Sequence, residues 1–206
     1  MIFERLGAVV LALLLGSLPM GVIVAKIFYR KDIRKEGSGN IGAANAMRTL
    51  GRGAGALVLL LDALKGFAAA YVAQDVAGLP LALIAGLAAI LGHCYSPWLR
   101  FKGGKGVATE LGVLFALSWP AGLIFVGVWG AVVLSCGYAS VGSLLATLSS
   151  VATLWLFVNG WAALYATLVT ALIFWRHREN VDRLVRGREN RLIGASGSAS
   201  NPGGLP

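Results

Sequence analysis

Three long apolar segments constrain this chain more than any other feature of its sequence. They cover residues 6–27, 54–71 and 79–99, and each has about the 20 residues that a helix needs to cross a hydrocarbon core about 30 Å thick. The composition agrees, because 57% of the residues are hydrophobic and 13% are charged, with a mean hydropathy of +0.76. The sequence therefore predicts an all-α integral membrane protein and excludes a soluble enzyme.

Helix-breaking pairs divide the rest of the chain. Residues 107–175 are apolar almost throughout. Three pairs interrupt them: Trp-Pro at 119–120, Cys-Gly at 136–137 and Asn-Gly at 159–160. Three earlier helices are expected over residues 3–28, 54–73 and 81–98, with a short turn at residues 77–80 between the second and the third. Four later helices bring the predicted bundle to seven transmembrane helices with the N-terminus outside, and a five-helix arrangement with re-entrant short pieces is the alternative.

Basic residues orient these helices. The chain has 18 lysines and arginines against 9 acidic residues, for a formal net charge of +9. All but Arg5 and Lys65 fall in three segments, residues 26–52, 100–105 and 176–191. Because cytoplasmic loops carry an excess of lysine and arginine, all three segments and the C-terminus should be cytoplasmic. Cations dispersed in this way do not form the single patch typical of nucleic-acid binding, so no nucleic-acid partner is expected.

The last residues differ in composition from the rest. Residues 194–206 are mainly Gly, Ser, Ala, Asn and Pro, which cannot bury a core. We therefore expect one transmembrane domain over residues 1–193, followed by a disordered tail or a remnant of cloning.

The first polar segment of interest is residues 37–48, GSGNIGAANAMR. Glycine permits the positive φ angles that let backbone N–H groups converge on an anion, and Ser38 and Asn40 add neutral donors. Arg48 supplies a planar fork that grips phosphate with two hydrogen bonds. The alternative is an ordinary Gly-rich turn with Asn45 near a helix start.

The second segment is residues 101–109, FKGGKGVAT. Lys102 and Lys105 lie among three glycines at the start of an apolar helix, where free N–H groups and the helix dipole favour an anion. The segment is not a nucleotide-binding P-loop, because that pattern requires serine or threonine after the lysine and Gly106 stands there.

The third segment is residues 177–191, HRENVDRLVRGRENR. If the last membrane helix continues into it, His177 and Asn180 lie at positions i and i+3 and face the same side. Both side chains can then point into one pocket at the membrane surface.

Ionisable residues inside the expected helices also stand out, because they are costly in a bilayer. Asp62 and Lys65 lie at i and i+3 in one apolar helix, and Glu110 lies just after the second segment. Asp62 and Lys65 can form a mutually satisfied pair, or Asp62 can orient Arg48 or Lys105. The sequence does not choose between these arrangements.

Together the three segments resemble the motifs of the bacterial membrane acyltransferases that use acyl phosphate and glycerol 3-phosphate. The first looks like that family's G-S-G-N-x-G-A-x-N-x-x-R motif, the second contains its F-K-G-G-K-G-V-A-T, and the third follows its H-R-x-N-x-x-R-L-x-x-G-x-E-x-R. The resemblance covers the chain from the first helix to Leu192. It implies a compact bundle of seven helices in the bacterial cytoplasmic membrane, with the active site facing the cytoplasm.

The resemblance also implies roles for individual residues. The catalytic centre would contain Ser38, Arg48, Lys105, His177 and Asn180. Substrate-binding residues would be Gly39, Asn40, Asn45, Lys102, Gly103, Gly104, Gly106 and Ser143. Ser140 is close enough to Ser143 to be the alternative. Glu189 would support the site structurally.

The implied reaction moves the acyl chain from acyl phosphate to the sn-1 hydroxyl of glycerol 3-phosphate, giving lysophosphatidic acid and phosphate. An acyl phosphate is already activated, so the site needs cations and an aligned hydroxyl but no covalent nucleophile, metal or cofactor. Either His177 or the substrate's phosphate would take the hydroxyl proton. Expected partners are the two substrates, membrane lipid and the soluble enzyme that makes acyl phosphate. A transporter of a phosphorylated metabolite is the rival hypothesis, although no inverted repeat is evident.

Overall fold

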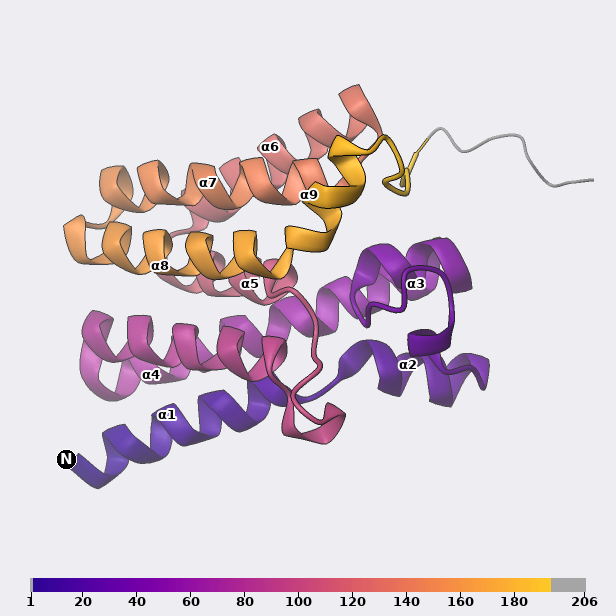
Figure 1. Cartoon of the computed structure of the whole chain (residues 1–206). Coiled ribbons are helices and arrows are strands. Elements are labelled where there is room, and N and C mark those ends of the chain that lie inside the picture. The colour runs from indigo at the N-terminus through magenta and orange to yellow at the C-terminus, as the bar shows by residue number, and fades with distance from the viewer. Residues whose placement is uncertain (1, 194–206) are drawn as a thin grey trace, which may run out of the picture.

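The computed structural model describes residues 2–193, and within them every regular element is a helix (Figure 1). The α-helices are α1 (Ile2–Ser17), α2 (Met20–Tyr29), α3 (Ala43–Leu50), α4 (Arg52–Cys94), α5 (Val107–Leu117), α6 (Trp119–Cys136), α7 (Ala139–Phe157), α8 (Gly160–Arg176) and α9 (Arg178–Val185). Two 3-10 turns complete the set: η1 (Ile33–Lys35) and η2 (Pro97–Leu99). The expected tail over 194–206 lies outside the described residues.

The first membrane helix is broken, so the expectation of one helix over residues 3–28 is wrong. α1 ends at Ser17, α2 begins at Met20, and the two are bent by 42°. Pro19 lacks an N–H and cannot continue the ladder of hydrogen bonds. Side chains from α4 and the loop after it satisfy the backbone at the break: Lys65 Nζ donates to Leu18 O at 2.9 Å, and Ser96 Oγ donates to Ser17 O at 2.7 Å.

α4 is two helices joined by a tight reversal. Ala77 and Gly78 leave the helical region, and Gly78 adopts a φ of 72°. Lys65 Nζ and His93 Nδ1 lie 2.8 Å apart, whereas in a straight helix these residues would be roughly 40 Å apart. Figure 1 shows the chain turning back at this point. The turn predicted between two helices here is confirmed.

The three later breaks are also confirmed. Ser118 separates α5 from α6 just before Pro120. Gly137 ends α6 with a φ of 81°. Asn159 caps α8, where its side-chain oxygen accepts from Ala162 N at 3.0 Å. Each break therefore falls at a residue whose local chemistry favours it.

The chain is membrane-embedded, but the length of its helices does not by itself give seven crossings. By length and apolar composition, three helices in the described residues can span a bilayer: Arg52–Leu99, taken as one, α6 and α7. The bent pair α1 and α2 would make a fourth. α5 has 11 residues and α8 has 17. The count of seven crossings and the side of each terminus stay predictions.

Small residues bring these helices close together. A Cβ on Gly112 of α5 would lie 1.8 Å from Ala63 O of α4, and one on Gly66 of α4 would lie 2.1 Å from Thr109 O of α5. Such contacts are typical of membrane helices, which pack through small residues. The close packing fixes α5 against the first half of α4 and so places the loop that precedes α5.

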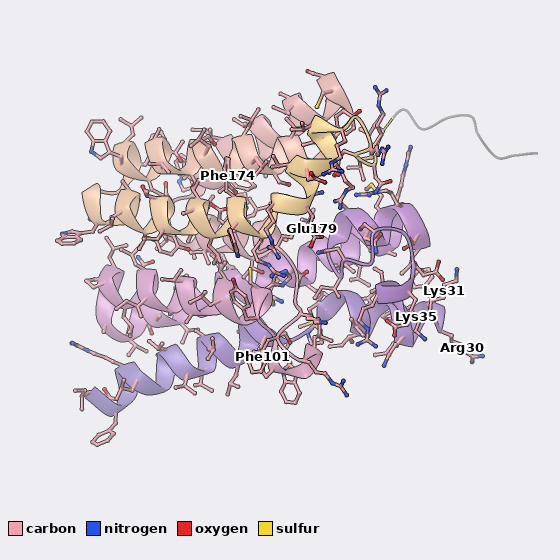
Figure 2. All side chains as sticks on the ribbon, viewed as in Figure 1. Arg30, Lys31, Lys35, Phe101, Phe174 and Glu179 are labelled. Atoms are coloured by element: carbon pink, nitrogen blue, oxygen red, sulfur yellow. The ribbon has the colours of Figure 1, made fainter. Side chains whose placement is uncertain are left out.

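The polar segments gather at one end of the bundle. Figure 1 shows α3 and α9 at the end opposite the start of α1, and in Figure 2 Arg30, Lys31 and Lys35 project beyond α2 at that end. All three of these cations are exposed. The arrangement agrees with a shared cytoplasmic side for the basic segments.

Candidate active site

A cavity of about 250 Å³ opens where the three polar segments meet. Its polar lining includes Ser38, Asn40, Asn45, Arg48, Asp62, His93, Lys105, Ser140, Ser143, His177, Asn180, Arg183, Glu189 and Asn190. Its apolar lining includes Leu59, Val107, Ala108, Leu111, Phe125, Val126 and Trp129. All five residues expected in the catalytic centre therefore lie around one space.

The amide of Asn45 organises the first segment. Its Oδ1 accepts from Ser38 N at 2.9 Å, and its Nδ2 donates to Asn40 O at 2.8 Å and Glu36 O at 3.0 Å. These bonds fold the Gly-rich loop around a buried amide. Asn45 was predicted to bind substrate, but its amide hydrogen-bonds the loop instead. Ser38 is exposed and lines the cavity.

Arg48 brings a cation to the cavity from α3. Its Nε donates to Ala44 O at 3.1 Å, and within residues 2–193 its guanidinium makes no ion pair. Partial burial lowers the pKa of Arg48 from its ordinary value, but an arginine remains charged at neutral pH. The remaining donors of this fork are suited to an anion in the cavity.

Two glycines of the second segment are bound to the end of α4. Gly103 N donates to Cys94 O at 3.1 Å, and Gly104 N donates to His93 O at 3.0 Å. These N–H groups are therefore occupied. Val107 and Ala108 line the cavity instead, at the first turn of α5, where helical N–H groups lack intrahelical partners.

Five predicted substrate-binding residues lie outside the lining of the cavity: Gly39, Lys102, Gly103, Gly104 and Gly106. The glycines shape the loops, and Lys102 is exposed to the surroundings. A substrate contact by any of them stays a prediction.

Lys105 is the cation that the second segment delivers to the cavity. Its Nζ donates to Asn180 Oδ1 of α9. Burial, together with the positive charge of Arg183, lowers the pKa of Lys105 to about 8. The ammonium is therefore charged at neutral pH and loses its charge in mildly alkaline solution.

His177 lies beside Lys105 as a neutral ring. Burial first, and then the charge of Lys105, lowers the pKa of His177 to about 4. Its Nδ1 lies 2.9 Å from Ile173 O, and because a carbonyl oxygen only accepts, Nδ1 carries the proton. Nε2 is then the unprotonated nitrogen, able to accept a hydrogen bond from a hydroxyl.

Glu189 connects three side chains around the cavity. Its Oε1 accepts from Ser140 Oγ at 3.0 Å and from Asn180 Nδ2 at 2.6 Å, and its Oε2 accepts from Arg183 Nε at 2.8 Å. Burial acts to raise the pKa of Glu189, but these hydrogen bonds outweigh it and lower the pKa. The carboxylate orients Asn180, which in turn holds Lys105.

Asp62 forms an ion pair with Lys65 rather than orienting a cavity cation. Its Oδ1 lies 2.7 Å from Lys65 Nζ and 3.5 Å from His93 Nδ1. Neither Arg48 nor Lys105 is its ion-pair partner in the described chain.

Three features of the cavity were not predicted from the sequence: Arg183, Asn190 and the apolar wall. Arg183 belongs to the third segment, but only the fold shows that it contacts Glu189. The apolar wall carries no local signal, because Phe125 and Trp129 look like any other residues of a membrane helix. Ser140 and Ser143 both line the cavity, so position alone does not separate them.

Comparisons of the sequence and of the structure with known proteins point to the same family. Residues 6–187 match the family model for glycerol-3-phosphate acyltransferase. A glycerol-3-phosphate acyltransferase of Rhodopseudomonas palustris (strain BisB5) is 45% identical over 192 residues, which cover 93% of this chain and 98% of the relative.

Two crystal structures share the fold. They show PlsY (YgiH), an integral membrane glycerol 3-phosphate acyltransferase, in a glycerol 3-phosphate form and a lysophosphatidic acid form. Their TM-scores are 0.87 and 0.85, at 43% and 42% identity, and each comparison covers 91% of this chain and 95% of the other. The fold and the site thus define a membrane-embedded acyltransferase. The chain belongs to the glycerol-3-phosphate acyltransferase family.

Proposed function

We propose that this enzyme transfers an acyl chain from acyl phosphate to the sn-1 hydroxyl of glycerol 3-phosphate, releasing lysophosphatidic acid and phosphate. The supporting observation is one cavity that combines an apolar wall with cations that form no ion pair within residues 2–193. Arg48 and Lys105 supply the charge, and Leu111, Phe125 and Trp129 belong to the wall. A donor with a phosphate head and a hydrocarbon tail matches both parts. The glycerol 3-phosphate and lysophosphatidic acid forms of PlsY agree with the proposed acceptor and product.

The chemistry requires no covalent acyl-enzyme. The sn-1 hydroxyl oxygen attacks the acyl carbonyl carbon, a new ester bond forms, and the bond between that carbon and the phosphate oxygen breaks. Arg48 and Lys105 bind the phosphate and offset the charge that grows on it as it leaves. Holding both substrates in one cavity supplies the alignment that makes the attack effectively unimolecular.

His177 aligns the attacking hydroxyl through its unprotonated Nε2. The hydroxyl proton passes either to that nitrogen or to a phosphate oxygen of the substrate. A ring whose pKa is about 4 in the empty site is a weak base, and anionic substrates would raise this pKa. Removing the imidazole in His177→Ala should lower kcat by roughly 10²-fold to 10⁴-fold if it is the base. A kcat near that of the wild type would leave the substrate's phosphate as the proton acceptor.

The proposed setting is the bacterial cytoplasmic membrane, with the cavity facing the cytoplasm. We propose that residues 1–193 form one domain that crosses the bilayer seven times with its N-terminus outside. The halves of α4 would count as separate crossings, and the shorter α5 and α8 would complete theirs with flanking residues. The soluble enzyme that makes acyl phosphate would deliver the donor to this side.

Release of phosphate from palmitoyl phosphate tests the proposed function. The detergent-purified protein should release phosphate only when glycerol 3-phosphate is present, and Arg48→Ala should abolish most of that release. Arg52→Ala is the matched control, because Arg52 is exposed at the start of α4, four residues after Arg48, and does not line the cavity. Absence of release by folded wild-type protein, or equal loss in both variants, would contradict the proposal.

A further inference from the structure

Arg176 makes a set of contacts that the proposed reaction does not yet use. Its Nη2 donates to Gly103 O at 3.0 Å and to Gly104 O at 2.9 Å, and its Nε donates to Gly104 O at 3.1 Å. The guanidinium also lies over the ring of Tyr95, 5.2 Å from its centroid. One side chain from the end of α8 therefore binds two successive carbonyls of the loop that leads to Lys105.

The same two glycines are also held through their N–H groups. Gly103 N and Gly104 N donate to carbonyls at the end of α4. A Cβ at Gly104 would lie 2.1 Å from His93 Nε2, so the loop is pressed against the His93 ring. That ring is itself fixed, because His93 Nδ1 accepts from Lys65 Nζ at 2.8 Å. The loop is thus clamped between α4 and Arg176.

The backbone of Arg176 continues directly into His177, which lines the cavity. Arg176 is the last residue of α8, and His177 follows it. Arg176 does not line the cavity, whereas Lys105 and His177 both do. The side chain of Arg176 therefore holds the Lys105 loop, and its main chain carries His177.

We propose that Arg176 is a positioning residue that sets the spacing between Lys105 and His177. This inference rests on the proposed acyl transfer. Because phosphate binding and hydroxyl alignment must occur at a fixed separation, a displacement of about 1 Å is enough to lower the rate about 10²-fold. The guanidinium fork suits the task, since its rigid donors reach two carbonyls at once and a lysine offers only a point charge on a flexible stem.

The experiment compares three variants in the phosphate-release assay. Arg176→Gln removes the fork and should lower kcat roughly 10²-fold, with a smaller effect on KM. Arg176→Lys should recover part of that loss. Arg178→Gln is the matched control, because Arg178 is exposed, donates to Trp175 O and lies over the Trp175 ring without reaching the loop. It should retain wild-type kcat.

The pH profile distinguishes positioning from a general loss of folding. The charged groups that act on Lys105 are those of Arg183, Glu189, Glu179 and Arg48, and all remain in Arg176→Gln. If the loop moves out of its clamp, Lys105 becomes more hydrated and its pKa rises. The alkaline limb of the pH–rate profile, which is the decline in rate expected near pH 8 as Lys105 loses its charge, then shifts to higher pH. Arg178→Gln should leave that limb unchanged.

Each outcome decides the inference. Wild-type kcat in Arg176→Gln, or a lower kcat with an unmoved alkaline limb, would overturn it. If Arg176→Gln does not fold, Arg176→Lys takes its place: a lower kcat with a shifted limb supports positioning, and wild-type behaviour overturns it. A wild-type protein without activity would contradict the proposed function instead, so the two failures are distinguishable.

Discussion

Two lysines in this molecule lie in polar clusters that differ in how completely their charge is satisfied. Lys65 is buried in α4, and its Nζ contacts Leu18 O, His93 Nδ1 and Asp62 Oδ1 within 2.9 Å. Two of these contacts are hydrogen bonds, to Leu18 O and His93 Nδ1, and in the third the charge of Asp62 balances that of Lys65.

Lys105 belongs to a cluster with excess positive charge. Lys105, Arg48 and Arg183 line the cavity together with the carboxylates of Glu189 and Asp62. Arg183 already binds Glu189 at 2.8 Å, and Lys65 already pairs with Asp62. Neither Arg48 nor Lys105 forms an ion pair within the described chain. Removing one partner from the closed cluster of Lys65 leaves the other charge buried and unpaired, whereas the open cluster of Lys105 has free energy to gain from an anionic ligand.

The same substitution at both lysines tests this contrast and should give the largest effect. Lys65→Met leaves Asp62 buried without its ion-pair partner, which should lower the free energy of unfolding by about 3–5 kcal/mol. The thermal transition of the detergent-solubilised protein should fall accordingly. Activity should fall at least in step with the folded fraction, because Lys65 also fixes the His93 ring that lies against the Lys105 loop.

Lys105→Met should do the reverse. Removing a cation from a cluster with excess positive charge should leave the thermal transition near that of the wild type, while kcat falls roughly 10²-fold to 10³-fold with the loss of one phosphate donor. A stable but inactive Lys65→Met, or an unstable Lys105→Met, would break the distinction between the closed and open clusters.

The acidity of Lys105 gives a second, smaller test. Its pKa is lowered to about 8, so the ammonium is charged below that pH and neutral above it. The value of kcat/KM should therefore decline as the pH rises through 8, by about tenfold for each pH unit beyond the pKa. Initial rates of phosphate release between pH 6 and pH 10 measure this limb.

Lys105→Arg identifies the group responsible. A guanidinium stays charged throughout this range, so the variant should lose the alkaline limb even if its maximal rate is lower. The spontaneous hydrolysis of palmitoyl phosphate at each pH serves as the blank. Persistence of the limb near pH 8 in Lys105→Arg would assign it to a different group.

Local chemistry explains which parts of the fold were predictable. The breaks at Gly78, Pro120, Gly137 and Asn159 follow from residues that disfavour a continuing helix, whatever surrounds them. Pro19 carries the same signal, but its apolar neighbours favoured one continuous helix. The break there is stabilised by Lys65 and Ser96, which are distant in sequence, and local patterns do not reveal such partners.

The site was predictable where a residue acts through its own chemistry. Arg48, Lys105 and His177 can bind an anion or accept a proton through their own side chains, and the three motif segments that contain them point to them. The roles of Asn45 and Arg176 depend on carbonyls that only the fold brings near. The occupied N–H groups of Gly103 and Gly104 show the same limit, since a glycine-rich loop has the same sequence whether its donors are free or bound.

The smallest expected effects concern Ser140 and Ser143, which both line the cavity. Ser140 Oγ donates to Glu189, whereas Ser143 Oγ donates to Ala139 O at 2.7 Å and accepts from Trp129 Nε1 at 3.3 Å. If Ser140 acts through Glu189, Ser140→Ala should lower kcat/KM roughly fivefold, equivalent to about 1 kcal/mol. Ser143→Ala should act independently of Glu189.

A double-mutant cycle with Glu189→Gln separates the two serines. Residues in one hydrogen-bond network are not additive, whereas independent sites are. Ser140→Ala should therefore have almost no further effect on kcat/KM in the Glu189→Gln background, and Ser143→Ala should keep its full effect there. The opposite pattern would make Ser140 the direct substrate contact. Because Glu189 orients Asn180 and Asn180 holds Lys105, the expected pattern would also connect Ser140 to the cation that binds phosphate.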